Sequence, residues 1–335
     1  MRGGPSSEYD VSLKTGTAIL NALRGPLVDE YQAIDIFIDR AGVWHIDGIQ
    51  VSPADLSSRI DVVINALHGA FGEDGTVQSI LEAHGVPFTG SPSFASALGM
   101  NKAHAKESFK RQGVKTPLGK VISASDIFIN ADLVAVELFR SFPMPVIMKP
   151  VSGGSSIGVS VAGTIAELVP ALQSAAEHGD VLVEEFISGG VEATVGVVEG
   201  FRGQELYALP VIEIRVPRGK VLSDAVFDYA KKYAASPVDA PPVALAVQEI
   251  IPASFSPEIK SALEDLAKKA HASVGARHYS RTDFIVHPRR GIYALEINTL
   301  PGLTEQSLVP RALSAVGSNV HEFVRHIISL AEKAK

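Results

Sequence analysis

Hydrophobic and polar positions along this chain follow two different spacings, and each spacing predicts an element. Residues 61–67 (DVVINAL) form a short continuous apolar run, which is typical of a buried parallel strand, and residues 85–89 predict a second strand. A helix is expected to begin near Thr76, between these runs, and another is expected over residues 103–112, closed by Gly113. The first hundred residues therefore alternate strand and helix, which favours an open α/β domain of the Rossmann-like kind.

A second unit, of the α+β kind, follows this domain. Residues 145–149 and 181–187 predict strands on either side of a helix over residues 165–176, and a Gly/Ser-rich loop lies at residues 152–158. The first pattern stops around residues 114–122, which is where we expect the linker between the two units.

Two further helices are expected in the last part of the chain. Residues 256–258 (SPE) combine a capping residue, a proline in the first turn and an acid near the positive helix end, and Gly275 closes this helix. Apolar residues at helical spacing over residues 320–331 predict an amphipathic final helix. Residues 235–247, rich in Ala, Pro and Val, are the expected flexible loop.

A β-hairpin is predicted between these two helices. The apolar-rich runs 282–286 and 292–297 flank a polar, turn-forming stretch, PRRG. If Arg289 and Arg290 lie at the tip, Asp283 faces Glu296 and Arg281 faces Asn298. Side chains alternate along a strand, so these four residues are expected to share one face.

Two carboxylates at facing positions repel each other unless a cation lies between them. Carboxylate oxygens with an amide carbonyl suit Mg²⁺ or Mn²⁺, and no Cys or His competes on that face. We therefore predict that Asp283, Glu296 and Asn298 are metal ligands. The residues alone leave open a solvated polar face on an amphipathic hairpin.

Length, charge and cysteine content narrow the class of protein. With 335 residues, 46% of them hydrophobic, the chain can form two or three domains with apolar cores. A formal net charge of -7 without a long Lys/Arg block argues against general nucleic-acid binding, and the absence of cysteine excludes disulfides and thiolate chemistry. No apolar run reaches the ~18 residues of a membrane helix, and the first residues lack a signal-peptide core. We expect a soluble, cytoplasmic protein with no membrane or nucleic-acid partner.

Seven segments carry glycine-rich and charged patterns in a fixed order: HGAFGEDGTVQ, SALGMNKAHAK, VIMKPVSGGSSIGVS, VLVEEFISGGVEATV, FDYAKKY, RTDF and EINTLPGLTEQSLVP. In that order they resemble the successive signatures of the D-alanine–D-alanine ligases of the ATP-grasp superfamily, over nearly the whole chain. The resemblance implies an N-terminal Rossmann-like (pre-ATP-grasp) domain over residues 1–100 and a two-part ATP-grasp fold. Its central part would cover residues 101–188 and its C-terminal part residues 189–335.

The resemblance also implies an activity. One D-alanine would be activated by ATP as D-alanyl phosphate and attacked by the amine of a second D-alanine, with two Mg²⁺ ions, or Mn²⁺, as cofactors. The product would serve peptidoglycan precursor synthesis, and the family suggests a homodimer. For this chemistry the protein supplies positioning, worth ~7–11 kcal/mol of the barrier, and charge neutralisation.

An ATP site is implied by the same resemblance. It consists of two phosphate lysines, a backbone cradle, an adenine-binding strand edge, a ribose-binding acid and a lid lysine on the γ-phosphate. In that order these are Lys102 and Lys149; Ser155 and Ser156; Glu184, Glu185, Phe186 and Ile187; Glu192; and Lys232. From the residues alone, a Gly/Ser loop is usually a turn, and Lys149 could extend from a strand end to water.

The substrate and catalytic residues follow from the same motifs. Arg281 and the backbone N–H of Gly302 would stabilise the tetrahedral oxyanion, and Ser307 and Leu308 would bind the second D-alanine carboxylate. The resemblance places four residues around the first D-alanine, with Glu8 facing its ammonium group: Glu8, His68, Ser155 and Tyr233. It also makes the three hairpin ligands the two-magnesium site.

The chain departs from the family pattern at two places. Family members begin with an apolar strand before a Gly-Gly turn, whereas here only two residues precede Gly3-Gly4. We therefore expect the first strand to be missing, through a misassigned start or a differently built sheet edge, which affects the placement of Glu8. Gln306 stands where many members carry His, which bears on the second-substrate pocket.

Other activities stay open at this point. Tyr233 after Lys232 favours an amino-acid acceptor over D-lactate, but D-serine or another carboxylate and amine pair would fit the same motifs. A nucleotide-binding pseudoenzyme is the alternative from a different class, although intact metal ligands argue against it. NAD binding is disfavoured, because no G-x-G-x-x-G follows a first strand.

Overall fold

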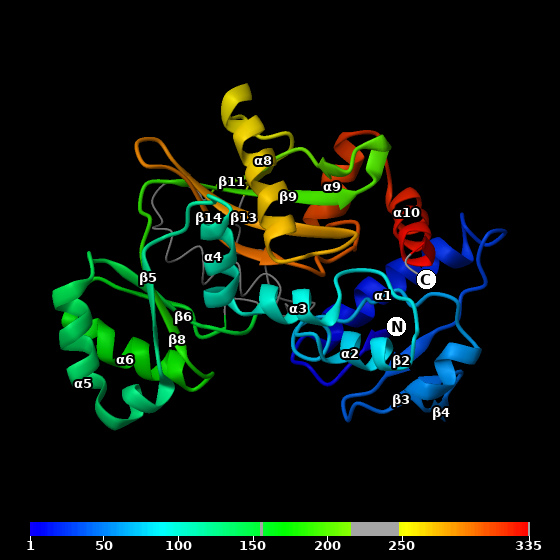
Figure 1. The fold of residues 1–335 in the computed structure, drawn as a ribbon, viewed down its shortest axis with the longest axis horizontal. Helices are drawn as coiled ribbons and strands as arrows, with labels where there is room; N and C mark the ends of the chain where they lie inside the picture. Colours follow the sequence, from blue (N-terminus) through cyan, green and yellow to red (C-terminus); the bar gives the residue numbers. More distant parts are fainter. Residues whose placement is uncertain (155–156, 216–247, 334–335) are drawn as a thin grey trace, which may run out of the picture.

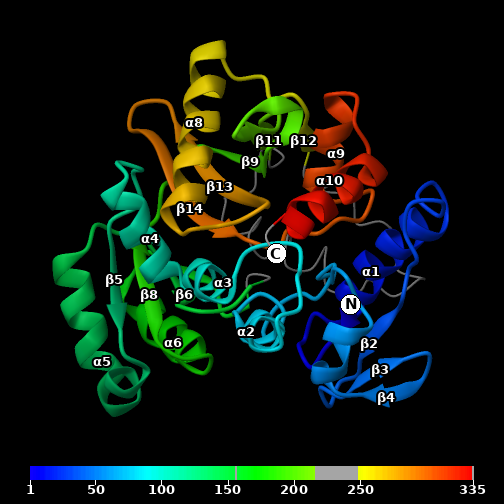
Figure 2. The ribbon, with the colours of Figure 1, turned by 45° about the vertical axis from the view of Figure 1, so that its right-hand side comes forward.

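The computed structural model describes residues 1–154, 157–215 and 248–333. Predictions on Ser155, Ser156, Lys232, Tyr233 and the loop at residues 235–247 lie outside these ranges. Within them, the strands form three sheets, and each sheet belongs to a separate lobe of the molecule (Figures 1 and 2).

The N-terminal lobe contains a four-stranded sheet in the order β1-β2-β3-β4, in which β1 runs parallel to β2 and the other pairs are antiparallel. Its strands are β1 (Arg2–Gly3), β2 (Ile36–Ile38), β3 (Trp44–Ile46) and β4 (Ile49–Val51). Its helices are α1 (Tyr9–Arg24), the 3-10 turn η1 (Pro53–Ser58), α2 (Thr76–Ala83) and α3 (Ser93–Met100). The helix expected near Thr76 is confirmed. The lobe has its own apolar core, to which the sheet contributes Ile38 and Trp44 and the helices Leu56 and Leu81.

The two strands predicted over residues 61–67 and 85–89 are wrong as regular elements. These segments are joined by one isolated parallel bridge, between Val63 and Phe88. The physical reason is that side-chain oxygens, and not the carbonyls of a neighbouring strand, accept hydrogen bonds from the backbone N–H groups of Asn65 and Leu67. The Asn65 side-chain oxygen accepts from the N–H of Leu67 (3.0 Å), and the N–H of Asn65 donates to the hydroxyl of Thr89 (3.4 Å).

The first strand, expected to be missing, is present as the two residues of β1. The backbone N–H of Ala66 donates to Met1 O (3.0 Å), so the extended segment that includes Val63 lies along the free side of β1. The N–H of Gly3 donates to the hydroxyl of Ser12 in α1 (2.8 Å). This short edge is enough to lead the chain to Glu8, the N-cap residue of α1.

The central lobe is an antiparallel sheet in the order β5-β8-β6-β7, covered by two helices. Its elements are β5 (Gly119–Ile122), α5 (Ala124–Ser141), β6 (Val146–Pro150), β7 (Ser160–Ala162), α6 (Ile165–Ala176) and β8 (Val181–Glu185). The predicted helix over residues 165–176 is confirmed, and the two predicted strands appear as β6 and β8. The expected linker at residues 114–122 leads into this lobe and ends in β5.

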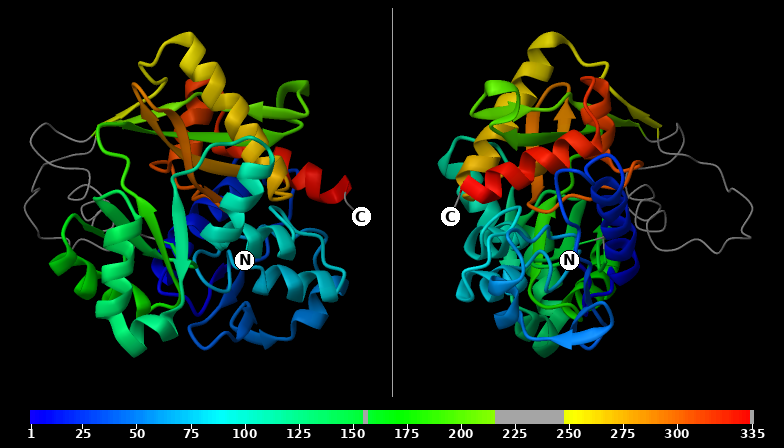
Figure 3. Two further views of the ribbon diagram at one scale, coloured as in Figure 1. Left: turned by 60° about the vertical axis from the view of Figure 1, so that its left-hand side comes forward. Right: turned by 90° about the vertical axis from the view of Figure 1, so that its right-hand side faces the viewer.

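The C-terminal lobe is built on a six-stranded sheet in the order β12-β11-β9-β13-β14, with β10 paired to β9. Its strands are β9 (Val191–Glu199), β10 (Leu206–Ala208), β11 (Ile212–Arg215), β12 (Gln248–Ile250), β13 (Tyr279–His287) and β14 (Gly291–Asn298), with the 3-10 turn η2 (Phe201–Gly203). The helices are α4 (Lys102–Arg111), α8 (Pro257–Ser273), α9 (Leu308–Ala315) and α10 (Val320–Lys333). Helices α4 and α8 pack against β14, and α10 packs against α1 of the N-terminal lobe (Figure 3).

Three predicted helices are confirmed here. The helix closed by Gly113 appears as α4, the capped helix after residue 256 as α8, and the amphipathic final helix as α10. Ser256 caps α8 through its side chain, which accepts from the N–H of Ile259 (3.4 Å). Helix α10 packs against α1 of the N-terminal lobe. Its buried face, which includes Phe323 and Ile327, lies in one core with Ile19 and Leu23 of α1.

The predicted hairpin is present, with the predicted pairs but a different tip. Asp283 faces Glu296 and Arg281 faces Asn298, as expected. The tip, however, closes with His287 opposite Gly291, so three residues lie in the turn instead of two centred on Arg289 and Arg290. A β-bulge between Asp283 and Phe284 leaves one extra residue on β14. Beyond it, at the end of the hairpin away from the tip, the pairing is the predicted one.

Among the helices in the described ranges, none combines the length and the apolar character that crossing a membrane would require.

Candidate active site

Three lysines and two glutamates form a charged cluster where the central and C-terminal lobes meet. Lys149 on β6 reaches Glu184 on β8 at 2.8 Å, and Lys106 on α4 pairs with the same carboxylate. Lys102, at the start of α4, donates to Gly153 O (2.5 Å) in the Gly/Ser loop and lies 3.8 Å from Glu296 on β14. The predicted phosphate lysines and a predicted metal ligand are therefore neighbours.

Burial and charge act against each other in this lysine cluster. Burial acts to raise the pKa of Glu184, yet the charges of Lys106 and Lys149 hold that pKa below its usual range. Burial lowers the pKa of Lys106 to about 8 and also lowers that of Lys102. Burial would lower the pKa of Lys149 too, but the charges of Glu184 and Glu296 raise it. Buried positive charge in excess of its partners favours binding of a polyanion such as a nucleotide phosphate.

The predicted adenine edge, residues 184–187, covers the last two residues of β8 and the two residues after it. The N–H groups of Glu185 and Phe186 already donate to Leu118 O (2.9 Å) and Pro145 O (3.0 Å). The Glu185 side chain accepts from the N–H of Leu118 (3.0 Å) and pairs with Arg290 at the hairpin tip (2.5 Å). Ile187 is buried in a small apolar cluster with hairpin side chains. The backbone N–H groups of Glu185 and Phe186 therefore already have hydrogen-bond partners, and Ile187 provides an apolar surface. Glu184 belongs to the lysine cluster.

The two acids of the hairpin, Asp283 and Glu296, lie close to positively charged side chains of the protein as well as facing each other. Asp283 accepts two hydrogen bonds from the Arg281 guanidinium, at 3.0 and 2.9 Å, and one from the Thr194 hydroxyl at 2.5 Å. Burial acts to raise the pKa of Glu296, but Lys102, Lys149 and Arg281 hold it below its usual range. The carbonyl of the Asn298 side chain accepts from the N–H of Leu300 (2.7 Å).

Glu192 is a third acid in the same region. It lies on β9, across from Ile285 of the hairpin. Burial raises its pKa to about 7, and the charges of Asp283 and Glu296 act in the same direction. A cation or a pair of hydroxyl groups beside it would stabilise its charged form.

The predicted metal ligands on the hairpin provide only some of the oxygen atoms that a divalent metal ion needs. Within the described ranges, no three His, Asp or Glu side chains are close enough together to form a complete metal-binding group. Asp283, Glu296 and the amide oxygen of Asn298 offer two charges and one neutral donor. Mg²⁺ is usually bound by one or two carboxylates plus substrate phosphates and water, so this donor set suits it when a nucleotide is present.

Glu8 and His68 bring the N-terminal lobe to the site. The Glu8 carboxylate lies 2.6 Å from the place where a Cβ on Gly69 would stand and 3.8 Å from that of Gly154. His68 is buried, with its ring held between Thr15 on α1 (Nε2 to Oγ1, 2.8 Å) and Glu73 (Nδ1 to Oε1, 3.2 Å). The short β1 therefore does deliver Glu8 to the Gly/Ser loop.

The loop after β14 completes the group. The Ser307 hydroxyl lies 3.0 Å, and the His68 ring 3.9 Å, from the place of a Cβ on Gly302. Ser307 is the N-cap residue of α9, while the Leu308 side chain is buried in the core. Leu308 can therefore offer a ligand its backbone N–H at the helix start, and Arg281 borders the same small gap as Leu308.

Comparison with known proteins decides the family. Two family models match the chain: "D-ala D-ala ligase N-terminus" over residues 47–91 and "D-ala D-ala ligase C-terminus" over residues 108–329. The chain belongs to the D-alanine–D-alanine ligase family.

Relatives of this ligase family match over almost the full length. The chain is 35% identical over 333 residues to the D-alanine–D-alanine ligase of Pelotomaculum thermopropionicum, covering 99% of this chain and 95% of that one. It is 36% identical over 335 residues to that of Halalkalibacterium halodurans, covering 99% and 97%. Among solved structures, VanG D-Ala:D-Ser ligase from Enterococcus faecalis has a TM-score of 0.81 at 26% identity, covering 98% and 97%. The Rossmann-like and ATP-grasp fold is confirmed.

One residue of the ligase site was missed by the sequence analysis. Lys106 shares Glu184 with Lys149, and it lies one helical turn after Lys102 on α4. The i, i+4 spacing of the two lysines was the available signal.

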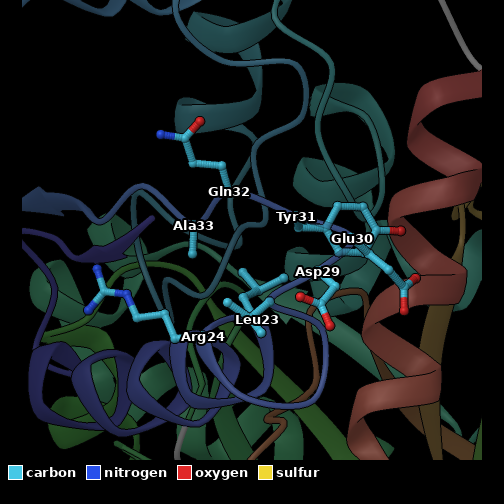
Figure 4. Close-up of a pocket in the computed structure, with 8 residues that line it drawn as sticks. Leu23, Arg24, Asp29, Glu30, Tyr31, Gln32 and Ala33 are labelled. Atoms are coloured by element: carbon cyan, nitrogen blue, oxygen red, sulfur yellow. The ribbon is translucent and has the colours of Figure 1, made fainter.

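A surface hollow of about 360 Å³ lies apart from the ligase site, between the end of α1 and residues 28–33, beside α10 (Figure 4). Its lining mixes Arg24 with Asp29 and Glu30, and Glu30 pairs with Arg325 of α10 (2.7 Å). Among the predicted site residues that lie in the described ranges, none borders it.

Proposed function

We propose that this chain is an ATP-dependent D-alanine–D-alanine ligase that acts in peptidoglycan precursor synthesis. ATP would phosphorylate the carboxylate of one D-alanine, and the amine of a second D-alanine would displace the phosphate to form the dipeptide. One observation carries the proposal: Lys102 approaches Glu296 at 3.8 Å, which joins the phosphate lysines to the hairpin acids in a single site. Full-length relatives with this name at about 35% identity support it.

Each group has a task that its surroundings support. Lys102 and Lys149 would bind phosphate oxygens, because their side chains are largely buried and Lys102 already contacts the Gly/Ser backbone loop. Arg281 and the N–H of Gly302 would stabilise the oxyanion of the tetrahedral intermediate. These donors come from separate segments, so their relative positions depend on how the lobes pack together.

The two D-alanine molecules would occupy the region between the lobes. Glu8 would hold the ammonium group of the first, close to His68 and to Gly154 of the loop. Ser307 and the N–H of Leu308 would bind the carboxylate of the second at the start of α9.

Asp283, Glu296 and Asn298 would hold two Mg²⁺ ions, or Mn²⁺, together with the nucleotide. The metal neutralises phosphate charge when bound. Glu192 would bind the ribose hydroxyls. Its pKa is raised by burial and by neighbouring acids, so hydrogen bonds donated by hydroxyl groups would stabilise its charged form.

A phosphate-release assay with purified protein, ATP, Mg²⁺ and a panel of D- and L-amino acids tests the proposal. We expect release that depends on D-alanine. Glu296→Gln should abolish turnover, because it removes a metal ligand and leaves Lys102 without that partner. ATP binding without D-alanine-dependent release would contradict the ligase and favour a pseudoenzyme.

The acceptor is the finer question, since the structural relative is named a D-Ala:D-Ser ligase. We propose D-alanine, because the curated relatives at 35% identity carry that name. Competition of D-alanine with D-serine and D-lactate, with products separated by mass spectrometry, decides it. Dominant D-Ala-D-Ser or depsipeptide would contradict the choice. The homodimer and the cytoplasmic location stay predictions, which light scattering and cell fractionation test.

A further inference from the structure

His278 stands immediately before β13 with an unusual backbone conformation. Its φ is +67°, in the left-handed region that favours glycine, yet it carries a ring and is 2% exposed. A bulky residue rarely adopts this region, because its Cβ crowds the backbone. Such a residue persists where its surroundings hold it, so the contacts of His278 need an explanation.

The ring of His278 accepts a hydrogen bond across the junction of two lobes. The backbone N–H of Gly90, in the N-terminal lobe, donates to Nδ1 of His278 (3.0 Å). The backbone N–H of His278 donates to the Glu199 carboxylate (2.6 Å), which fixes the residue to the end of β9. Burial, with the charge of Arg277, lowers the pKa of His278 to about 4, so the ring is neutral near pH 7 and Nδ1 can accept.

Arg277 holds the same segment of the N-terminal lobe. Its backbone N–H donates to the Ser91 hydroxyl (3.1 Å), and its guanidinium donates to Gly90 O (3.2 Å) and Phe88 O (3.4 Å). The guanidinium also lies 5.2 Å from the centre of the Phe88 ring. Residues 88–91 are thus tied to the start of β13 by side-chain and backbone groups together.

The tied segment contacts both loops that carry substrate groups. On one side, Thr89 bonds to Val63 O (2.9 Å) and to the N–H of Asn65 (3.4 Å), in the extended segment that continues to His68. On the other side, Leu300, two residues before Gly302, lies 3.8 Å from the place of a Cβ on Gly90. Arg281, on β13, follows His278 by three residues.

We propose that His278 is a positioning residue for the ligase reaction. By accepting from the N–H of Gly90, it fixes residues 88–91 and so sets His68 and Gly302 at their working distance from Arg281. The inference rests on the proposed function, since that function places His68 beside the first D-alanine and gives Arg281 and Gly302 the oxyanion.

Two substitutions separate the ring acceptor from the backbone requirement. Both Gly and Asn tolerate the left-handed region, but only Asn has a side-chain acceptor, at the position that Nδ1 of His occupies. His278→Gly relieves the backbone strain but leaves a cavity and removes the acceptor of the Gly90 N–H, so it should unfold at a lower urea concentration than the parent while remaining folded in buffer. We expect kcat/KM for D-alanine to be lowered about tenfold and KM for ATP to change less than about twofold. His278→Asn should recover most of the D-alanine efficiency. Asp47→Gly, at an exposed turn with φ of +51°, controls for a glycine that merely relieves strain.

Amide hydrogen exchange gives a second measurement that does not depend on turnover. In His278→Gly, exchange in the peptide containing Gly90 should accelerate, while His278→Asn should keep it slow. Equal D-alanine kinetics in the parent and the Gly variant would overturn the positioning role, as would unchanged exchange at Gly90. If the parent itself shows no D-alanine-dependent phosphate release, the proposed function fails and the positioning role falls with it. If the parent is active, the kinetics and exchange of the two variants alone support or overturn the positioning role.

Discussion

Replacing Glu192 with Gln should stabilise the protein above neutral pH while weakening its use of ATP. Glu192 lies on β9 in a partly buried position, close to the charges of Asp283 and Glu296. Its pKa is raised from 4.5 to about 7, with burial as the first cause and those two charges as the second. At about 1.4 kcal/mol per pH unit, the charged form costs the folded state about 3 kcal/mol.

The sign of the effect follows from proton binding. Between pH 4.5 and about 7 the folded protein keeps a proton that the unfolded chain has lost, so this group makes stability fall as pH rises through that window. Above pH 7 both states are charged and the whole cost is present. Gln removes the charge but keeps the size, so the gain in unfolding free energy for Glu192→Gln should be about 2 kcal/mol larger near pH 8 than near pH 5.

Urea unfolding of both proteins without nucleotide, near pH 5 and near pH 8, measures this difference. Glu205→Gln, at an exposed bend, controls for a general effect of removing a carboxylate. The same preparations should show a raised KM for ATP in the Gln variant, because the acid that we propose to bind the ribose is lost. A gain that is equal at both pH values would refute the argument that the folded protein holds the charge of Glu192 at a cost.

Two further substitutions test the phosphate and first-substrate sites, in addition to those already described. Lys149→Met should raise KM for ATP and lower kcat by about 100-fold in the phosphate-release assay, because a buried cation is lost from the lysine cluster. The exposed Lys120→Met on β5 should leave both constants unchanged, and equal losses in the two variants would contradict the assignment. Gly69→Ala should lose about 1–3 kcal/mol of unfolding free energy, because φ is +70°, and should raise KM for D-alanine, because its Cβ would stand 2.6 Å from the Glu8 carboxylate. Gly113→Ala has nearly the same φ, +72°, with nothing within 4 Å of its Cβ, so it should lose stability alone; if it lost activity too, backbone strain and not Glu8 would be the cause.

The hairpin shows how far a local pattern can be trusted. Alternation of side chains along the two strands predicted that Asp283 faces Glu296, and the pairing is confirmed. The tip was wrong by one residue, and the bulge before Phe284 compensates for it. The extra residue of the bulge is Leu295 on β14, and β13 keeps a regular register with β9 from Tyr279 to Val286. Neither the bulge nor this second partner of β13 is visible from the hairpin sequence.

Lys106 and the segment at residues 61–67 show the same limit in other ways. Lys106 lies within the helix predicted over residues 103–112, and only the tertiary structure shows that it pairs with Glu184 on β8. The apolar run before His68 had the composition of a buried strand, but Asn65 and Thr89 form side-chain bonds there that compete with the ladder.

By itself, the sequence determined the order of the elements, the helix caps at Gly113 and Ser256, the facing hairpin residues and the motifs that indicated the family. Those features depend on residues that are close together in the sequence, so local backbone preferences and side-chain periodicity are enough to predict them. Only the tertiary structure decided that Lys106 shares Glu184, that Glu192 has a raised pKa among the hairpin acids, and that His278 binds Gly90. These depend on distances and burial between segments up to 188 residues apart, which are set when the lobes pack together.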